Sequence, residues 1–547
     1  MTKTLTTGRI LLLGNIGNRL RIMRRVIQCL KLTGITACLH AAALADEKPL
    51  VQPYEAAGFA VSESRIDTLV FSALRKADIK PALPCSDEVF VRRVFLDVIG
   101  LPPEPGEARA FLEDKRPDKR AALIDSLLAR DEYADYWTMK WCDLLRVKSE
   151  FPINLWPNAV QAYQRWLRDA VKANMPYDHM ARELLTSSGS NFRAPQVNFC
   201  RAVQGRGPQP LAAAVALTFM GSRIEKWPAD RRAGLEALFS RVMFKPTAEW
   251  KEEIVCLDPA QFGPMDAVLP DGRKIKVQPG MDPRVTFADW LVSPGNRWFS
   301  RAAVNRTWAW IFGRGIVHEP DDLRADNPAS VPGLLELLDK EFAANGYDQK
   351  KLIRLILNSR VYQLSPVPKS DSPRAAAMFA SYPVRRLEAE VLQDALCQLT
   401  GTTEGYNSPI PEPFTYIPAS ARSVNLADAS ITSSFLEMFG RSQRDSGFVM
   451  ERNNKISDAQ RLHLLNSSQV QGKIEKSWRL KNLLQGNRGN PSKVVRAVWL
   501  AVLSRPPLPE EEREVLANSF TDKQGAKQAV DDLGWALVNS KEFLYRH

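Results

Sequence analysis

Apolar residues recur at spacings of three and four along most of the chain. After residue 62, for example, Ile66, Leu69, Val70, Ala73 and Leu74 repeat with the period of an α-helix. The same period predicts helices over residues 90–99, 123–128, 211–220, 298–312, 332–344, 349–359, 385–400, 494–503 and 531–545. We therefore predict a mainly α fold.

One stretch breaks the helical period. Residues 267–277 hold two short β-type runs around Asp271-Gly272, which is a typical signal for a hairpin. The surrounding residues carry five prolines and indicate a boundary between two helical lobes. The predicted organisation is a signal peptide 1–45, an extended lead-in 46–60, a first helical domain 61–257, a Pro-rich linker with the β-hairpin 258–283, and a second helical domain 284–547.

The first 45 residues predict export. They contain no acidic side chain and seven basic ones, and a signal-like unit starts at Met23 with a basic region and an apolar run. Ala43-Leu44-Ala45 offers the small-x-small site that signal peptidase cleaves. We expect a mature protein that starts at Asp46 and resides in the periplasm or at the cell surface.

Two alternatives stay open for this segment. Residues 35–38 resemble a lipoprotein box, which would place a lipid on Cys38. A retained membrane anchor is disfavoured because the apolar run is short and interrupted by polar residues. No transmembrane span is expected after the signal is removed.

Net charge argues against a nucleic-acid partner. The formal charge of the whole chain is +12, and the seven basic residues of the signal segment supply more than half of it. The mature chain would keep +5 over about 500 residues, which is not a nucleic-acid-binding balance.

Cysteine and histidine are too sparse for a recognisable metal or haem site. The mature part has five cysteines, which are Cys85, Cys142, Cys200, Cys256 and Cys397. None forms CxxC or CxxCH, so a disulfide scaffold, a zinc knuckle and covalent haem are not predicted, while one unassigned disulfide stays open. Its histidines are His179, His318, His463 and His547. We predict no cofactor and no metal centre built from several histidines.

Tryptophan offers two interpretations. Trp137 and Trp141 lie four residues apart on one face of a predicted helix, which is typical of core packing. The alternative is a platform on which sugar rings stack, and it requires exposed indoles. Trp156 and Trp166 follow on the next stretch.

The stretch 305–324, NRTWAWIFGRGIVHEPDDLR, carries the candidate chemistry. Its candidate catalytic residues are Arg314, His318, Asp321 and Asp322. Asp321 and Asp322 could bind a hard cation such as calcium, and a His–Asp pair could act as a general base. The structural alternative is a helix that ends at the glycines 313 and 315, followed by a turn whose aspartates cap the next segment.

Arginine–glutamate pairs offer a weaker signal. Arg386 and Glu390 lie four residues apart, which predicts an ion pair within a helix. A clamp for an anionic ligand is the alternative. Glu451 and Arg452, near Asp458, receive the same interpretation.

Several motifs resemble one family of exported proteins described from planctomycetes and related bacteria. In the first half they are residues 95–103 and 174–178, and in the second half residues 282–284, 305–324, 357–364, 385–390 and 535–543. The chain is identified by them, over nearly all of residues 60–547, as a member of the family with two adjoining cytochrome-associated domains of unknown function (PSCyt-two and PSD-one type). The resemblance implies no settled biochemical activity.

Many relatives look as though they carry a Cys-x-x-Cys-His-x-His-Pro motif late in the first domain. The matching place here is residues 220–228, where only Gly221 and Pro228 remain. The sequence also has no N-terminal cytochrome module, so the resemblance does not imply electron transfer for this member.

Two functional hypotheses remain. The first is a noncatalytic binding or scaffold module that contacts polysaccharide or surface proteins. The second is a carboxylate-dependent hydrolase of polysaccharide. Carbohydrate is suggested by the lifestyle of organisms rich in the family and not by a motif. Two carboxylates facing each other across roughly 5–10 Å would favour the hydrolase, and an aromatic-lined groove without such a pair would favour the binding module.

Overall fold

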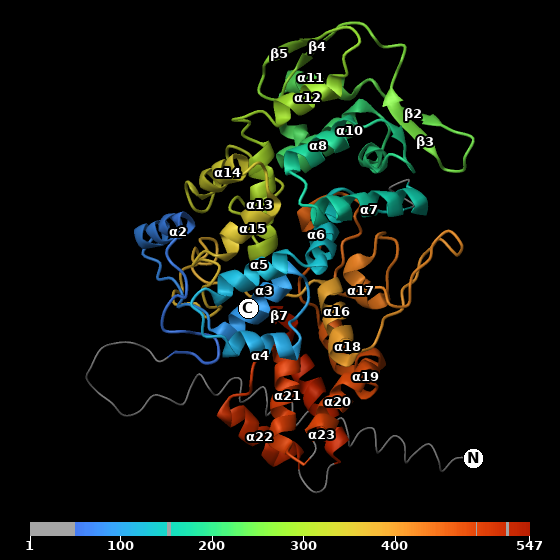
Figure 1. Cartoon of the computed structure of the whole chain (residues 1–547). Coiled ribbons are helices and arrows are strands. Elements are labelled where there is room, and N and C mark those ends of the chain that lie inside the picture. Colours follow the sequence, from blue (N-terminus) through green and yellow to red (C-terminus); the bar gives the residue numbers. More distant parts are fainter. Residues whose placement is uncertain (1–49, 150–154, 488, 521–524) are drawn as a thin grey trace.

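The computed structural model describes residues 50–149, 155–487, 489–520 and 525–547. Helices dominate this part of the chain and strands occur only in small sheets, which confirms the predicted mainly α fold (Figure 1). The predicted signal peptide and residues 46–49 of the predicted lead-in lie outside the described residues, while residues 50–60 are described and form no helix. Within the described ranges, no helix is both long and apolar enough to cross a membrane.

The first half is built from short helices. They are α2 (Arg65–Lys76), α3 (Asp87–Val98), α4 (Pro105–Glu113), α5 (Lys119–Leu128), α6 (Asp131–Leu144), α7 (Pro157–Lys172), α8 (Tyr177–Thr186), α9 (Asn198–Arg201), α10 (Pro208–Met220) and α11 (Ala229–Phe239). Local chemistry explains their ends. In α2 the Ser64 hydroxyl accepts from the Asp67 amide while the Asp67 carboxylate accepts from the Ser64 amide, and this capping box satisfies two otherwise free N–H groups.

Two small antiparallel sheets follow. The predicted hairpin is confirmed, because β4 (Met265–Val268) pairs with β5 (Lys274–Val277) around Asp271-Gly272. A three-stranded sheet of β1 (Gly189–Ser190), β3 (Glu253–Leu257) and β2 (Val242–Pro246) was not predicted. Its apolar runs are only a few residues long, too short for their period to separate a strand from a helix.

The second half is again helical. Its elements are α12 (Pro283–Leu291), α13 (Phe299–Phe312), α14 (Leu334–Ala344), α15 (Gln349–Leu357), β6 (Arg385–Arg386), α16 (Ala389–Thr400), the 3₁₀ turn η3 (Ser423–Asn425), α17 (Ser434–Met438), α18 (Asp458–Asn466), α19 (Ser468–Glu475), α20 (Trp478–Gly486), α21 (Pro491–Leu503), α22 (Pro509–Ser519), α23 (Ala526–Val538), α24 (Lys541–Leu544) and β7 (Tyr545–Arg546).

The helix predicted over residues 385–400 begins later than expected. Arg385 and Arg386 form β6 and pair with β7, and α16 starts at Ala389. Arg386 donates to the carbonyl of Phe439 and does not pair with Glu390. Pairing with a strand far away in the sequence overrides the local helical period here.

One hydrophobic core runs through both halves, from Ile66 to Phe543. Helices α12 to α15 pack on α8, α10, α2 and α5, while η3 contacts α6 and α21 contacts α4. Trp137 and Trp141 are buried, which confirms their predicted place in the core. The two predicted lobes thus share a core.

Candidate functional site

The stretch 305–324 ends α13 as a well-packed helix stop. Ile311 and Phe312 are buried, and the Trp310 ring lies 5.4 Å from that of Trp141 between centroids. Gly313 supplies the left-handed residue that closes the helix, with φ of 72°. Gly315 has a different role, because a Cβ there would lie 2.3 Å from the Val317 carbonyl oxygen.

Asp321 is engaged in a structural contact. Its carboxylate accepts from Arg306, with both side chains 1% exposed, and from the backbone amide of Val449 at 2.7 Å. Arg306 also donates to the carbonyls of Leu217 and Thr218 at the C-terminal end of α10. A cation at that end satisfies free carbonyls and opposes the helix dipole.

The other three candidates do not converge with Asp321. Asp322 pairs with Arg324 at 2.8 Å. His318 is half-buried, and burial together with the nearby Arg314 lowers the pKa of its imidazole. Within the part of the chain that the structure describes, no group of three or more His, Cys, Asp or Glu side chains could hold a metal ion.

Residues 220–228, the place of the relatives' cysteine–histidine motif, pack against this same stretch. The Gly221 carbonyl accepts from the Leu323 amide at 2.8 Å, and Arg223 pairs with Glu319 at 3.1 Å. Trp227 donates its indole N–H to Ser222. In this chain the segment forms a helix end and an ion pair.

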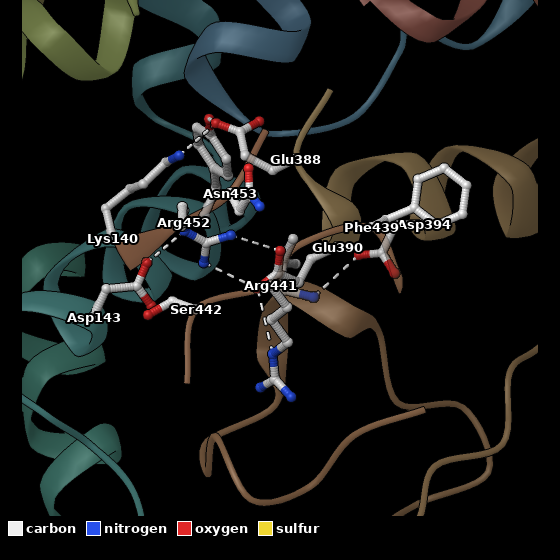
Figure 2. A network of polar contacts seen from close by, with 12 residues as sticks. Lys140, Asp143, Glu388, Glu390, Asp394, Phe439, Arg441, Ser442, Arg452 and Asn453 are labelled. Carbon is white, nitrogen blue, oxygen red and sulfur yellow. Dashed lines mark hydrogen bonds and ion pairs between the residues drawn. The ribbon is translucent and has the colours of Figure 1, made fainter. Parts of the chain in front are cut away.

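A buried ion network joins the two halves of the chain. Figure 2 shows Lys140 and Asp143 of α6 facing Glu388, Glu390 and Arg452. The Arg452 guanidinium binds the Glu390 carboxylate through two nitrogens, at 2.7 and 2.9 Å, and also contacts Asp143. Lys140 Nζ lies 2.5 Å from Glu388 Oε1.

The network continues through the C-terminal strand. Arg546 of β7 contacts Glu388 at 2.8 Å and Asp97 at 3.3 Å, and Arg385 contacts Asp97 at 2.8 Å. The hydroxyl of Tyr382 donates to Asp97 as well. Asp97 and Glu388 each therefore accept from several donors, which balance their negative charge.

Burial and neighbouring opposite charges shift the pKa values of these groups in opposite directions. Burial alone raises the pKa of Glu390, but Arg452 and Arg441 outweigh it and lower that pKa to about 2. Burial lowers the pKa of Lys140 to about 8 although Glu388 opposes the change. These charges are paired inside the shared core, and such pairing is an ordinary structural use of ionisable groups.

A cleft opens beside this network, between the first and second halves. It consists of two adjoining hollows of about 420 Å³ and 260 Å³ that share Pro102, Glu104, Gln398, Trp478 and Arg479 in their walls. The combined size suits a small ligand or a few units of a chain. On α16, Asp394, Cys397 and Gln398 lie three and four residues apart and so face the cleft together.

Trp478 is the most exposed large side chain of the cleft, with 53% of its surface accessible. Its indole N–H donates to the Gly401 carbonyl at 2.9 Å. Gly401 closes α16 in the left-handed conformation, and a Cβ there would lie 2.0 Å from the indole nitrogen. Gly401 therefore allows the helix to end here and leaves space for the indole of Trp478.

Charged side chains surround the indole. The carboxylates that line the larger hollow are Glu104, Glu107, Glu132, Asp394 and Glu404, and the guanidinium groups are Arg130, Arg422 and Arg479. Most are paired with each other, as Arg479 is with Glu104 at 2.7 Å and Arg130 with Glu107 at 2.6 Å. Glu104, Glu107 and Glu132 also lie at helix N-termini, where a carboxylate is favoured by the dipole.

Asp394 is the least solvent-exposed carboxylate of the cleft. It is 4% exposed, and burial raises the pKa of its carboxyl although Arg422 opposes this. The backbone amide of Ser423 donates to it at 2.7 Å, which fixes η3 to α16. Asp394 thus combines a structural contact with the elevated pKa that a general acid needs.

Sequence reasoning did not find this cleft. Asp394 lies in the predicted helix 385–400 but was not a candidate, and Trp478 and Arg479 lay outside every motif. The only usable signals were Gly401 at the end of a helical period and a tryptophan directly after Ser477, a helix-capping residue.

The comparisons with known proteins agree with the motifs. The family model described as "Protein of unknown function (DUF1549)" matches residues 65–223, and the model described as "Protein of unknown function (DUF1553)" matches residues 283–519. No curated protein and no solved structure matches the chain. The chain therefore carries these two domains of unknown function next to each other in the sequence, and it belongs to the proteins that combine them.

Proposed function

We propose that this protein is an exported, noncatalytic binding module that holds a segment of polysaccharide in the cleft between its two family domains. The single observation that carries the proposal is the half-exposed indole of Trp478, set among paired carboxylates and guanidinium groups. An aromatic face packs against the C–H face of a sugar ring, and such charged groups accept from and donate to its hydroxyls.

Charge in the cleft favours a neutral ligand. The larger hollow is lined by five carboxylates against three guanidinium groups, so a polyanion would meet like charge. Nucleic acid is disfavoured for the same reason. Surface proteins remain the alternative partner.

The proposal predicts a defined loss on mutation. Trp478→Ala should weaken the binding of neutral oligosaccharides by about tenfold or more, because the stacking face is removed from a half-exposed position. Gly401→Ala should have a similar effect by displacing the indole, whereas Gly405→Ala is a matched control since nothing lies within 4 Å of its Cβ. A glycan array followed by calorimetry on the purified chain provides the measurement. Equal affinities of the wild type and Trp478→Ala would contradict the proposal.

A second candidate is a carboxylate-dependent hydrolase, favoured by the raised pKa of Asp394. In this case Asp394 would act as general acid and another cleft carboxylate, such as Glu132, would act as base or nucleophile. Product analysis with neutral polysaccharides distinguishes the two candidates. Release of oligosaccharides by the wild type and its loss in Asp394→Asn, at unchanged thermal stability, would replace the binding proposal by the hydrolase.

A further inference from the structure

Exposed aromatic side chains are not scattered evenly over the described residues. Five exceed half exposure: Trp250, Phe262, Phe414, Tyr416 and Trp478. Trp478 belongs to the cleft, while Trp250 and Phe414 lie on two loops and both contact the ring of Trp156. A contiguous group of exposed aromatic rings marks a surface that binds something.

Trp250 and Phe414 belong to an assembly that we call the aromatic platform, which consists of these two rings and Trp156. Trp156 precedes α7, and its ring centroid lies 6.5 Å from that of Trp250 and 5.5 Å from that of Phe414. Trp250 lies in the turn between β2 and β3, and Tyr416 follows Phe414 on the same loop, where it is 72% exposed. The β2–β3 hairpin projects from the body of the molecule (right in Figure 1).

We propose that the aromatic platform is a second carbohydrate-binding surface, which holds a neutral polysaccharide at a distance from the cleft. The proposal rests on the proposed function for its class of ligand. It adds a separate site, made of residues that do not line the cleft.

The chemistry around the rings selects this occupant. Lys251 Nζ lies 5.6 Å from the ring centroids of both Trp156 and Trp250, so a hydrogen-bond donor lies beside both rings. Exposed carboxylates adjoin the rings, Glu249 before Trp250 and Glu412 before Phe414. Rings that alternate with donors and acceptors suit a polyol.

The same groups disfavour the other occupants. Charges near the rings are balanced, because Lys251 and Arg193, which pairs with Glu249 at 3.8 Å, offset Glu249 and Glu412. A surface without excess positive charge has nothing to attract an anionic bilayer or an anionic polysaccharide. A protein partner usually covers a dense apolar centre, whereas polar residues separate the rings along both loops.

Sedimentation with insoluble polymers tests the platform. The full chain is mixed with microcrystalline cellulose, chitin or insoluble xylan, and separately with phosphatidylglycerol vesicles. The double variant Trp250→Ala, Phe414→Ala should reduce the partition of protein onto the bound polymer about tenfold or more. Phe262→Ala, which removes an exposed aromatic ring elsewhere, should sediment as the wild type does. Thermal melts of each variant report that folding is intact.

The outcomes separate this site from the cleft. We expect the platform double variant to keep wild-type affinity for soluble oligosaccharides, while Trp478→Ala loses that affinity. The platform is rejected if the double variant sediments with every polymer as the wild type does, if the wild type sediments with none, or if the two substitutions affect only vesicle binding. The cleft proposal fails independently if Trp478→Ala leaves oligosaccharide binding unchanged.

Discussion

Lys140 and Glu388 are separated by 248 residues in the chain, yet their side chains form a 2.5 Å ion pair in which both are nearly fully buried. Lys140 lies in the DUF1549 match and Glu388 in the DUF1553 match. Figure 2 shows this pair next to the cluster of Asp143, Glu390 and Arg452. The two family domains are therefore joined through compensated buried charge and not only through apolar contacts.

Arg452 should be the most sensitive member of this network. We expect Arg452→Met to lower the free energy of unfolding by about 3–5 kcal/mol, because it removes the main partner of two buried carboxylates. Removing Glu390 as well, in the double variant with Glu390→Leu, should cost less than the sum of the single changes. Urea unfolding of the single and double variants measures both effects.

An exposed pair provides the control for this prediction. Arg461 and Asp458 form an ion pair with side chains 65% and 90% exposed, so Arg461→Met should change the free energy of unfolding by no more than about 1 kcal/mol. A loss in Arg452→Met no greater than in Arg461→Met would show that the buried network is dispensable.

Gly315 and His318 should differ in a way that separates a helix stop from a site. Gly315→Val should cost about 1–3 kcal/mol, because its Cβ would collide with the Val317 carbonyl and the Asn305 side chain. His318→Ala should change stability by less than about 0.5 kcal/mol. Thermal melts measure both, with Gly263→Val as the control at a glycine whose Cβ would meet nothing. A severe loss in His318→Ala would contradict the turn assignment.

Acid should destabilise the protein through His547. Burial lowers the pKa of its imidazole from 6.5 to about 4, so the folded state binds this proton more weakly than the unfolded state does. The stability supplied by the neutral ring is therefore complete above about pH 6.5 and falls as the pH drops toward 4, by at most about 1.4 kcal/mol per pH unit. Urea unfolding between pH 7.5 and 4.5, a range set by these two pKa values, measures the free energy of unfolding as a function of pH. This free energy should fall less steeply with decreasing pH in His547→Phe than in the wild type.

The exposed His179 supplies the comparison for the pH series. Its side chain is 69% exposed, and His179→Phe should leave the slope unchanged. Glu390 contributes little in this window, because its stabilisation is lost mainly between its ordinary pKa of 4.5 and its folded value of about 2. Identical slopes for the wild type and His547→Phe would refute the assignment.

Purified protein should contain no stoichiometric zinc and no haem. The sequence lacks CxxCH, and the described residues contain no group of three or more metal-ligand side chains. Elemental analysis and the visible absorption spectrum test this, and EDTA should leave the melting temperature unchanged. One tightly held transition metal per chain would overturn the prediction.

Much of the secondary structure could be predicted because its causes are local. The helical period places most helices within a few residues of their observed ends, Gly313 closes α13, and Asp271-Gly272 forms the turn of the β4–β5 hairpin. The β1–β3–β2 sheet was not predicted, because its apolar stretches are too short to show a strand period. The start of α16 was predicted too early, because Arg385 and Arg386 form β6 and pair with β7, about 160 residues away.

The sequence was sufficient for the helical fold class, the hairpin and family membership, since each rests on neighbouring residues or contiguous motifs. The roles of the charged and aromatic residues could be assigned only from the tertiary structure. Asp321 is a structural partner because Arg306 and Val449 reach it, and Trp478 faces a cleft because Gly401 leaves room for its indole. These partners lie as far as 128 residues away for Asp321 and 77 residues away for Trp478, and no local period encodes such contacts.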